Sequence, residues 1–420
     1  MAYIFYIFQL LIPKCPLSSL WHEACDILSW LRQTGAAARL RRSSRQGEQA
    51  MDFGRISRRH LLQGGAALTL GAAAGARPAF AADTTIGFIY VGSRDDYGYN
   101  QAHAQGAAAL KKIPGLKVVE EEKVPETDAV EKTIESMINL DGASLLFPTS
   151  FGYYNPHMIK MATKFPKLRF EHCGGLWSDK DPKNAGSYFG YIDEAQYISG
   201  IVAGLTSKSG KLGFVAAKPI PQVLRNINAF ALGAKSVNPK ATTQVIFTGD
   251  WSMPVKEAEA TNSLIDQGVD VLTCHVDGPK TMVENAARRG AFVCGYHVNQ
   301  SPLAPKAYLT GAEWNWEALY PKFVKMIAAG EGIPNFYRGG LKEEIVKVSA
   351  YGEFVSAEAR KAADEAKAKF LSADGFAIFK GGLVDNKGKT VIAAGTDRGQ
   401  KDPELEKMDY LVEGVIGATS

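Results

Sequence analysis

Short apolar runs alternate with longer amphipathic segments along the chain beyond residue 84. The apolar runs, whose length is typical of buried strands, cover 85–91, 116–120, 143–147 and 168–171. The segments with apolar residues at helical spacing cover 100–112, 128–140 and 157–165. Strands that alternate with helices in this way predict a parallel sheet covered by helices on both faces.

The same alternation begins again after a predicted helix at 194–207. The second set of expected strands covers 211–215, 243–248, 269–274, 291–295 and 308–310, with helices at 223–237, 255–267 and 279–289. The remaining chain predicts helices at 314–329 and 357–370 and a β-ribbon of 377–380 with 391–394. We therefore expect an α/β fold of two doubly wound parallel-sheet domains joined by a hinge.

The resulting division of the chain has five parts. We expect a mis-assigned N-terminal extension at 1–50, a signal peptide at 51–81, an N-terminal α/β lobe at 82–207, a C-terminal α/β lobe at 208–312, and crossover helices and tail segments at 313–420. The last part is expected to contribute to both lobes and to the hinge.

The signal peptide is predicted from the order of three features. The pair Arg58-Arg59 precedes an uncharged apolar segment at 64–76, and Ala79-Phe80-Ala81 then supplies a cleavage site. The apolar segment is too short to span a bilayer, and the alternative is a buried Ala/Gly-rich helix. Export signals begin near the N-terminus, so Met51 is the expected start, unless Tyr3–Ile12 is a real apolar anchor. The pattern predicts a periplasmic protein exported by the twin-arginine route.

Removal of the leader changes the charge of the chain. Residues 1–81 contain ten Lys/Arg and four Asp/Glu, so the net charge changes from +4 to −2 in the remaining 339 residues. This balance gives no reason to expect nucleic-acid binding. Three cysteines remain, which is too few for a disulfide framework or a zinc site. Cys274 and Cys294 stand at or near the ends of successive predicted strands. They could form one disulfide bridge, or they could be free buried thiols.

Aromatic residues gather after the predicted strands, together with a few amides, carboxylates and histidines. Open α/β sheets bind their ligands off the carboxyl ends of the strands. Aromatic faces stack on flat rings, a few polar groups fix orientation, and no Lys/Arg cluster suits a phosphate. The pattern predicts a planar heterocyclic ligand. The candidate ligand-binding residues are Tyr97, Tyr99, Asn100, Phe151, Tyr153, Trp177, Trp251, His275, Asp277, His297, Glu313 and Trp314.

Several motifs, in their order along 85–416, resemble the basic membrane protein (PnrA-like) family of ABC-transporter substrate-binding proteins. They include Ile86–Tyr90, Asp95–Gln101, Phe147–Tyr153, Tyr197–Ala203, Asn228–Ala234 and Leu411–Val415. The resemblance implies a type I periplasmic binding fold and a purine base or nucleoside as ligand. It also implies that Tyr99 stacks on the base, that Asn100 binds it, and that Phe151 and Tyr153 form an aromatic loop.

The ribose-binding part of the family pattern does not carry over. Nucleoside binders have a G-V-D-S-D-Q-like run, whereas this chain has Gly295–Gln300 without either aspartate. The ribose-directed lysine is also missing, and Glu313-Trp314 stands in that region. The chain therefore resembles the adenine-binding branch, which shares the SFGY loop and the E-W pair.

These observations predict a monomeric periplasmic protein that binds an adenine-like base or a nucleoside by aromatic stacking between two lobes. It would deliver the ligand to an ABC-transporter permease, with no cofactor, metal or catalytic residue. One alternative is a nucleoside hydrolase-like enzyme, because His275, Asp277 and His297 offer a general base. However, the H-x-D spacing is common by chance, and adjacent Asp95 and Asp96 usually point apart. A second alternative is a ligand-sensing receptor module for a membrane signalling protein, which would share the fold.

Overall fold

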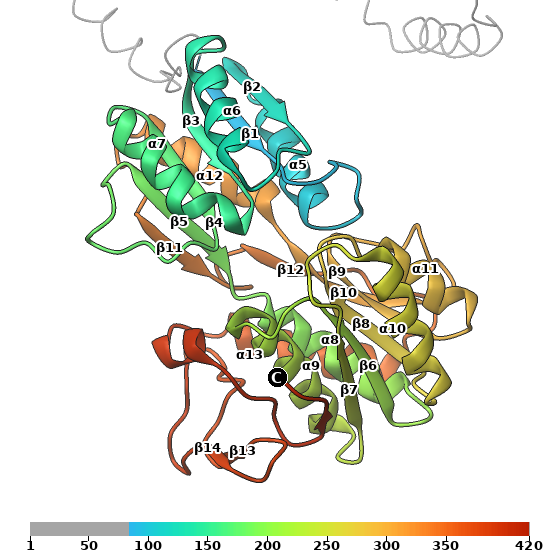
Figure 1. The fold of residues 1–420 in the computed structure, drawn as a ribbon. Helices are drawn as coiled ribbons and strands as arrows, with labels where there is room; N and C mark the ends of the chain where they lie inside the picture. The colour runs from blue at the N-terminus through green and yellow to red at the C-terminus, as the bar shows by residue number, and fades with distance from the viewer. Residues whose placement is uncertain (1–83, 420) are drawn as a thin grey trace, which may run out of the picture. The chain divides into compact units, whose positions relative to one another are not determined.

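The computed structural model describes residues 84–419, and the predicted extension and signal peptide lie outside this range. The first sheet has the strand order β11-β5-β4-β3-β1-β2, and all its neighbouring strands are parallel (Figure 1). Its strands are β1 Thr84–Ile89, β2 Leu116–Glu121, β3 Ala143–Pro148, β4 Arg169–Cys173, β5 Ala185–Gly190 and β11 Phe336–Gly339. Its helices are α5 Tyr99–Leu110, α6 Asp128–Asn139, α7 Ile159–Lys164 and α12 Trp316–Ala328. We call these elements the first lobe.

Alternate residues of β1 explain why helices cover both faces of this sheet. Ile86 and Phe88 are fully buried in the cluster that also contains α5 and α12 residues. Ile89 is buried on the other face with α6, and a side chain at Gly87 would meet Met137 of α6 at 2.8 Å. Successive strand residues point to opposite faces, so a continuous apolar run serves both layers.

The second sheet has the strand order β12-β10-β9-β8-β6-β7-β15, and only the β12–β10 pair is antiparallel. Its strands are β6 Lys211–Ala216, β7 Thr242–Phe247, β8 Val271–His275, β9 Phe292–His297, β10 Tyr308–Trp314, β12 Val346–Val348 and β15 Val415–Ile416. Its helices are α8 Asp193–Thr206, α9 Pro221–Val237, α10 Pro254–Asp266, α11 Lys280–Arg288 and α13 Ala357–Leu371. We call these elements the second lobe.

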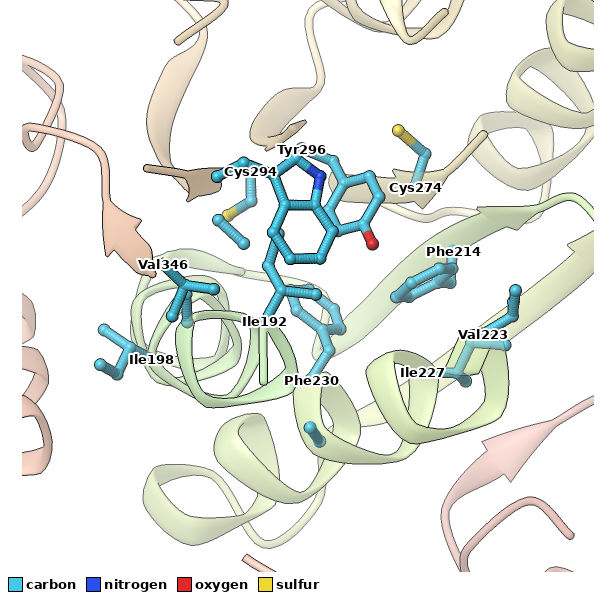
Figure 2. Packing of buried hydrophobic residues seen from close by; sticks show 14 of the residues in the cluster. Ile192, Ile198, Phe214, Val223, Ile227, Phe230, Cys274, Cys294, Tyr296 and Val346 are labelled. Carbon is cyan, nitrogen blue, oxygen red and sulfur yellow. The ribbon is translucent and has the colours of Figure 1, made fainter. Parts of the chain in front are cut away.

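The largest helix contact of the second lobe is the close approach of α8 and α9. A methyl group at Gly200 would lie 2.1 Å from the carbonyl oxygen of Phe230, so only glycine fits there. The ring of Phe230 meets Phe214 of β6 edge-on at 6.0 Å, and Figure 2 shows both rings among the buried side chains of this cluster. Through this contact α9 packs against β6 of the sheet.

The predicted fold class is confirmed, with local differences. Strands β5, β11, β12 and β15 were not expected, and the helix expected at 157–165 is a π-helical turn Tyr154–Met158 followed by α7. The predicted β-ribbon is displaced, because β13 Leu383–Val384 pairs with β14 Thr390–Ile392. Within residues 84–419, no helix is both long and apolar enough to cross a membrane.

The chain passes between the two sheets three times, after β5, after β10 and after β11. Figure 1 shows α12, drawn in orange, among the first-lobe elements although it follows β10 of the second lobe. The expected boundary at residue 207 assigned α8 to the first lobe, but α8 packs on α9, β10 and α13. The first crossing therefore lies before α8, near Gly190.

The lobes touch directly where the loop before α5 meets the loop after β8. The backbone N–H of Tyr99 donates to the carbonyl oxygen of Asp277 at 2.8 Å, and Nε2 of Gln300 donates to the carbonyl of Tyr97 at 2.7 Å. A methyl group at Gly98 would lie 1.8 Å from the same Asp277 oxygen. The absence of a side chain at Gly98 is therefore a condition for this closed contact.

We predict that Gly98→Ala separates the lobes, because the added methyl group overlaps the Asp277 carbonyl. Small-angle X-ray scattering should give a larger radius of gyration for this variant than for the unsubstituted protein. Gly399→Ala is the control, since a methyl group there meets nothing within 4 Å. An unchanged radius of gyration for Gly98→Ala would contradict the importance of this contact.

Candidate functional site

A cavity with about 480 Å³ of empty space lies between the facing strand ends of the two lobes. The first lobe contributes residues from α5, from β4 and β5 and from the loop after β3, and the second lobe contributes residues from α9, β8, β9 and β10 and their loops. The lining residues are Tyr99, Ser150, Phe151, Cys173, Phe189, Gln222, Trp251, His275, Asp277, His297 and Trp314.

Seven of the twelve predicted residues line this cavity together. They are Tyr99, Phe151, Trp251, His275, Asp277, His297 and Trp314. All seven follow or end a strand, and the carboxyl ends of parallel strands share one edge of each sheet, where open α/β sheets bind their ligands. The other five predicted residues do not line the cavity, and each has a structural contact elsewhere.

Two of these five residues stabilise the loop between β1 and α5. The side chain of Asn100 is buried, accepts from the backbone N–H of Gly92 at 3.1 Å and donates to Asp96 at 2.8 Å. The carbonyl of Tyr97 accepts from Gln300, and the backbone of Tyr97 has a positive φ of 52°. The amide of Asn100 is engaged within this loop, and its expected contact with a base stays a prediction.

The other three residues lie in packed surroundings. Tyr153 is fully buried in the core of the first lobe, and its hydroxyl donates to the carbonyl of Val124. The indole of Trp177 donates to a carbonyl of its own loop at 3.3 Å. Glu313 is buried and accepts from the hydroxyl of Ser349. Their expected contacts with a ligand stay predictions.

Sequence reasoning missed four lining residues. Ser150 and Cys173 lie two or three residues beyond the ends of predicted strands, in segments where ligand-binding residues were expected, but their small side chains were not selected. Phe189 lies in β5, a strand that was not predicted. Gln222 lies in the first turn of α9, and no rule used on the sequence selects such a position.

Tyr99 forms part of the wall between the cavity and the core of the first lobe. Its hydroxyl donates to the carbonyl oxygen of Thr149 at 2.6 Å, which fixes the ring on the first-lobe side. The ring contacts His297 of the second lobe edge-on at 5.5 Å, with an angle of 71° between the planes. Tyr99 therefore joins both lobes by its backbone and by its side chain.

His297 and Trp314 form a fixed pair on the second-lobe side. Nε2 of His297 donates to the carbonyl of Val276 at 3.0 Å, which leaves Nδ1 to accept from Nε1 of Trp314 at 2.8 Å. Burial holds the pKa of His297 well below its ordinary value, so the ring is neutral. Trp314 also stacks on Trp316 at 4.8 Å. This pair offers a rigid aromatic surface to the cavity.

His275 is the second neutral histidine of the cavity. The amide of Asn226 donates to its Nδ1 at 2.8 Å, so the ring proton resides on Nε2. Burial lowers the pKa of His275 to about 3. Its ring lies 6.0 Å from the indole of Trp251. A neutral imidazole with a protonated Nε2 can donate a hydrogen bond to a ligand nitrogen or oxygen.

Asp277 is the single carboxylate that lines the cavity. The residue is half-buried and lies where the two lobes meet. Burial raises the pKa of Asp277 well above its ordinary value, and the negative charge of Asp96 raises it further. A ligand N–H that donates to this carboxylate would stabilise its ionised form.

The lining set restricts the chemistry of the cavity. Neither lysine nor arginine is among the lining residues, so no cation is available for a phosphate. One carboxylate is not the pair that glycosidic bond hydrolysis needs. Within residues 84–419, no group of three His, Cys, Asp or Glu side chains could hold a metal ion. The cavity suits binding of a neutral, flat molecule.

Two doubly wound sheets, crossed three times by the chain and enclosing a cavity, define a type I periplasmic binding protein. Solved structures share this fold. One is a transcriptional activator of the comK gene from Bacillus halodurans, with a TM-score of 0.62 and 22% identity over 70% of this chain and 99% of that one. Another is an ABC transporter solute-binding protein from Conexibacter woesei, with a TM-score of 0.59 and 21% identity over 69% of this chain and 97% of that one.

The chain belongs to the PnrA-like family of ABC transporter substrate-binding proteins, which its residues 83–374 match. A purine-binding protein from Brucella abortus is 33% identical, over 79% of this chain and 92% of its own. A putative ABC transporter glucose-binding protein from Haloferax volcanii is 30% identical, over 82% of this chain and 83% of its own. Members of the family are extracellular or periplasmic binding proteins and not enzymes. Proteins of this class bind a small ligand and a permease.

We predict that Asp277→Asn stabilises the unliganded protein, and that the gain grows with pH. Because the folded-state pKa of Asp277 is raised, ionisation opposes folding as pH rises above its ordinary value near 3.8. Asparagine cannot ionise, so the difference in Tm between variant and parent should be small at pH 4 and larger at pH 7 to 8.

Asp250→Asn is the matched control for this measurement. The pKa of Asp250 is lowered, chiefly by its hydrogen bond from Lys218, so the same substitution there should not raise Tm at any pH. A Tm difference for Asp277→Asn that stays constant between pH 4 and pH 8 would contradict the raised pKa.

Proposed function

We propose that this protein is the periplasmic binding component of an ABC importer and captures an adenine-like purine base between its lobes. The observation that carries the proposal is the cavity itself, in which aromatic faces from both lobes surround one carboxylate and no cation. The relative from Brucella abortus is a purine-binding protein, which agrees with this composition. The base is then passed to a membrane permease.

Three aromatic side chains are available to a flat ring. Phe151 approaches from the first lobe, and Trp251 and Trp314 approach from the second lobe. Phe151 is 52% exposed and lines the cavity, so part of its side chain is uncovered and open to contact with a ligand. Stacking of a base on aromatic side chains contributes about 1–3 kcal/mol per base.

The polar groups match the edge of adenine. Its exocyclic amino group is a donor and the neighbouring ring nitrogen is an acceptor. In our proposal the carboxylate of Asp277 accepts from the amino group, and Nε2 of His275 donates to the ring nitrogen. The amide of Gln222 adds a donor and an acceptor at the cavity wall. This arrangement favours adenine over a purine that carries an oxygen at the same position.

The residues at the position of the family's ribose-binding segment favour a free base over a nucleoside as the ligand. Gln300 uses its amide on the backbone of Tyr296 and Tyr97. The hydroxyl of Tyr296 accepts from Asn226 at 2.8 Å. Glu313 is engaged by Ser349. No carboxylate from this part of the described chain lines the cavity, so a ribose hydroxyl pair would lack a strong acceptor.

The export route and the oligomeric state are part of the same proposal. The twin-arginine motif and the A-x-A site support cleavage after Ala81, with translation from Met51. We propose that the exported protein acts as a monomer, because the cavity is completed by the two lobes of one chain.

A thermal-shift screen of the full chain tests the proposed ligand class. Adenine should raise Tm, because a ligand that binds only the folded state stabilises it by about 2.7 kcal/mol at a concentration of 100 Kd. We expect a smaller shift with hypoxanthine and adenosine, and none with D-glucose. A shift with D-glucose and none with any nucleobase would contradict the proposal and indicate that the ligand is a sugar.

Phe151→Ala should weaken adenine binding by about 1–3 kcal/mol, the range for loss of one stacked aromatic side chain. Isothermal titration calorimetry measures the effect, and Tm without ligand should stay the same because the ring is exposed. Phe354→Ala is the matched control, since Phe354 is 49% exposed but does not line the cavity. Equal affinities of the two variants for adenine would show that Phe151 does not contact the ligand.

A further inference from the structure

A second hollow, which we call the side pocket, opens beside the ligand cavity. It is open to solvent on one side and shares Phe151 and Gln222 with the cavity. Gly174 lies at the junction, since a methyl group there would be 3.5 Å from Phe189 and 3.7 Å from Gln222 of the cavity wall. The two spaces are therefore neighbours that share walls.

The side pocket has an apolar lining that is left uncovered. Leu176 is 59% exposed and Phe151 is 52% exposed, and both line this one pocket. Ile220 and Pro221 face them from the second lobe. Large apolar side chains that are exposed singly need no explanation, but their grouping around one hollow indicates a binding site.

The polar groups of the side pocket are mostly engaged by the protein. The hydroxyl of Tyr154 donates to a carboxylate at 3.3 Å. The carbonyl of Gly175 accepts from Nη2 of Arg338 at 2.7 Å, and Glu406 accepts from Nη1 of Arg225 at 2.9 Å. The amides of Asn155 and Gln222 also line the pocket, but the three engaged groups need no partner from a ligand, so an apolar group beside them displaces water with little loss.

Both lobes form the side pocket, as they form the cavity. Tyr154 begins the π-helical turn of the first lobe and Leu176 lies in a loop of that lobe, whereas Ile220 and Pro221 belong to the second lobe. A group placed there contacts both lobes only when they are together. It would therefore add to the difference in affinity between the closed and open forms.

We propose that the side pocket receives an apolar substituent of the bound base, so that the preferred ligands are purines with an alkyl or aryl group. The proposal rests on the proposed function, because the base must occupy the adjoining cavity. Continuity through Phe151 and Gln222 identifies the occupant as part of the same small molecule.

Calorimetric titration of the full chain with adenine and with two homologous series tests the proposal. One series carries methyl, butyl and hexyl groups on the exocyclic nitrogen, and the other carries them on N9. In the series whose substituent faces the side pocket, affinity should rise roughly fourfold for each CH2 that is buried. The series that gains also reports which edge of the base faces the pocket.

Leu176→Ser shows whether the gain arises in the side pocket. This variant should bind adenine as the parent does, and should lose most of the gain for the hexyl ligand. Leu140→Ser is the matched control, because Leu140 is 82% exposed and lines neither space. A full hexyl gain in Leu176→Ser would place the alkyl group elsewhere and overturn the proposal.

The outcome with adenine alone separates the two proposals. If adenine binds and neither series binds more tightly, the side pocket has no role in ligand binding and the purine proposal stands. If no nucleobase binds, the purine proposal fails, and the inference about its substituent fails with it.

Discussion

The arrangement of the site depends on one backbone contact between the lobes. The carbonyl oxygen of Asp277 accepts from the N–H of Tyr99 at 2.8 Å, and Gly98 leaves the space for this approach. The side chains of Tyr99 and Asp277 then line the cavity that the contact closes. Closure and recognition therefore use the same residues, so that a ligand with contacts to both lobes favours the closed form.

The hinge is connected to the cavity by the second crossing segment. Trp314 ends β10 and lines the cavity, and Trp316 begins α12 in the first lobe, with the two indoles stacked at 4.8 Å. The N–H of Asn315 between them donates to the carbonyl of Ile345 in the third crossing segment at 2.8 Å. Movement of the lobes would thus move a wall of the binding site, as expected for hinge closure.

The sheets could be predicted because buried parallel strands are continuous apolar runs, as β1 and β3 are. The strand β5 was missed because its sequence Ala185–Gly190 contains two glycines and a serine. The strand β11 has only four residues. The sequence identifies the fold class, but short or small-residue strands acquire their structure from neighbours in the sheet.

The candidate site shows the same limit at the level of side chains. Sheet geometry brings Phe151, Trp251 and Trp314 to one place, so a rule about strand ends finds them. Tyr153 follows Phe151 by two residues, yet the turn between them directs it into the core. The hydrogen bonds that occupy Asn100 arise only when the loop has folded. The sequence alone therefore does not distinguish the residues of a loop that line the cavity from those that are buried in the core.

The most direct measurement is a crystal structure of the protein grown with adenine. The account predicts the base in the cavity between the lobes, with its ring about 4.5–7 Å from that of Phe151 and its amino group hydrogen-bonded to Asp277. A purine bound elsewhere, or one that lies in the cavity with its amino group turned away from Asp277, would contradict it.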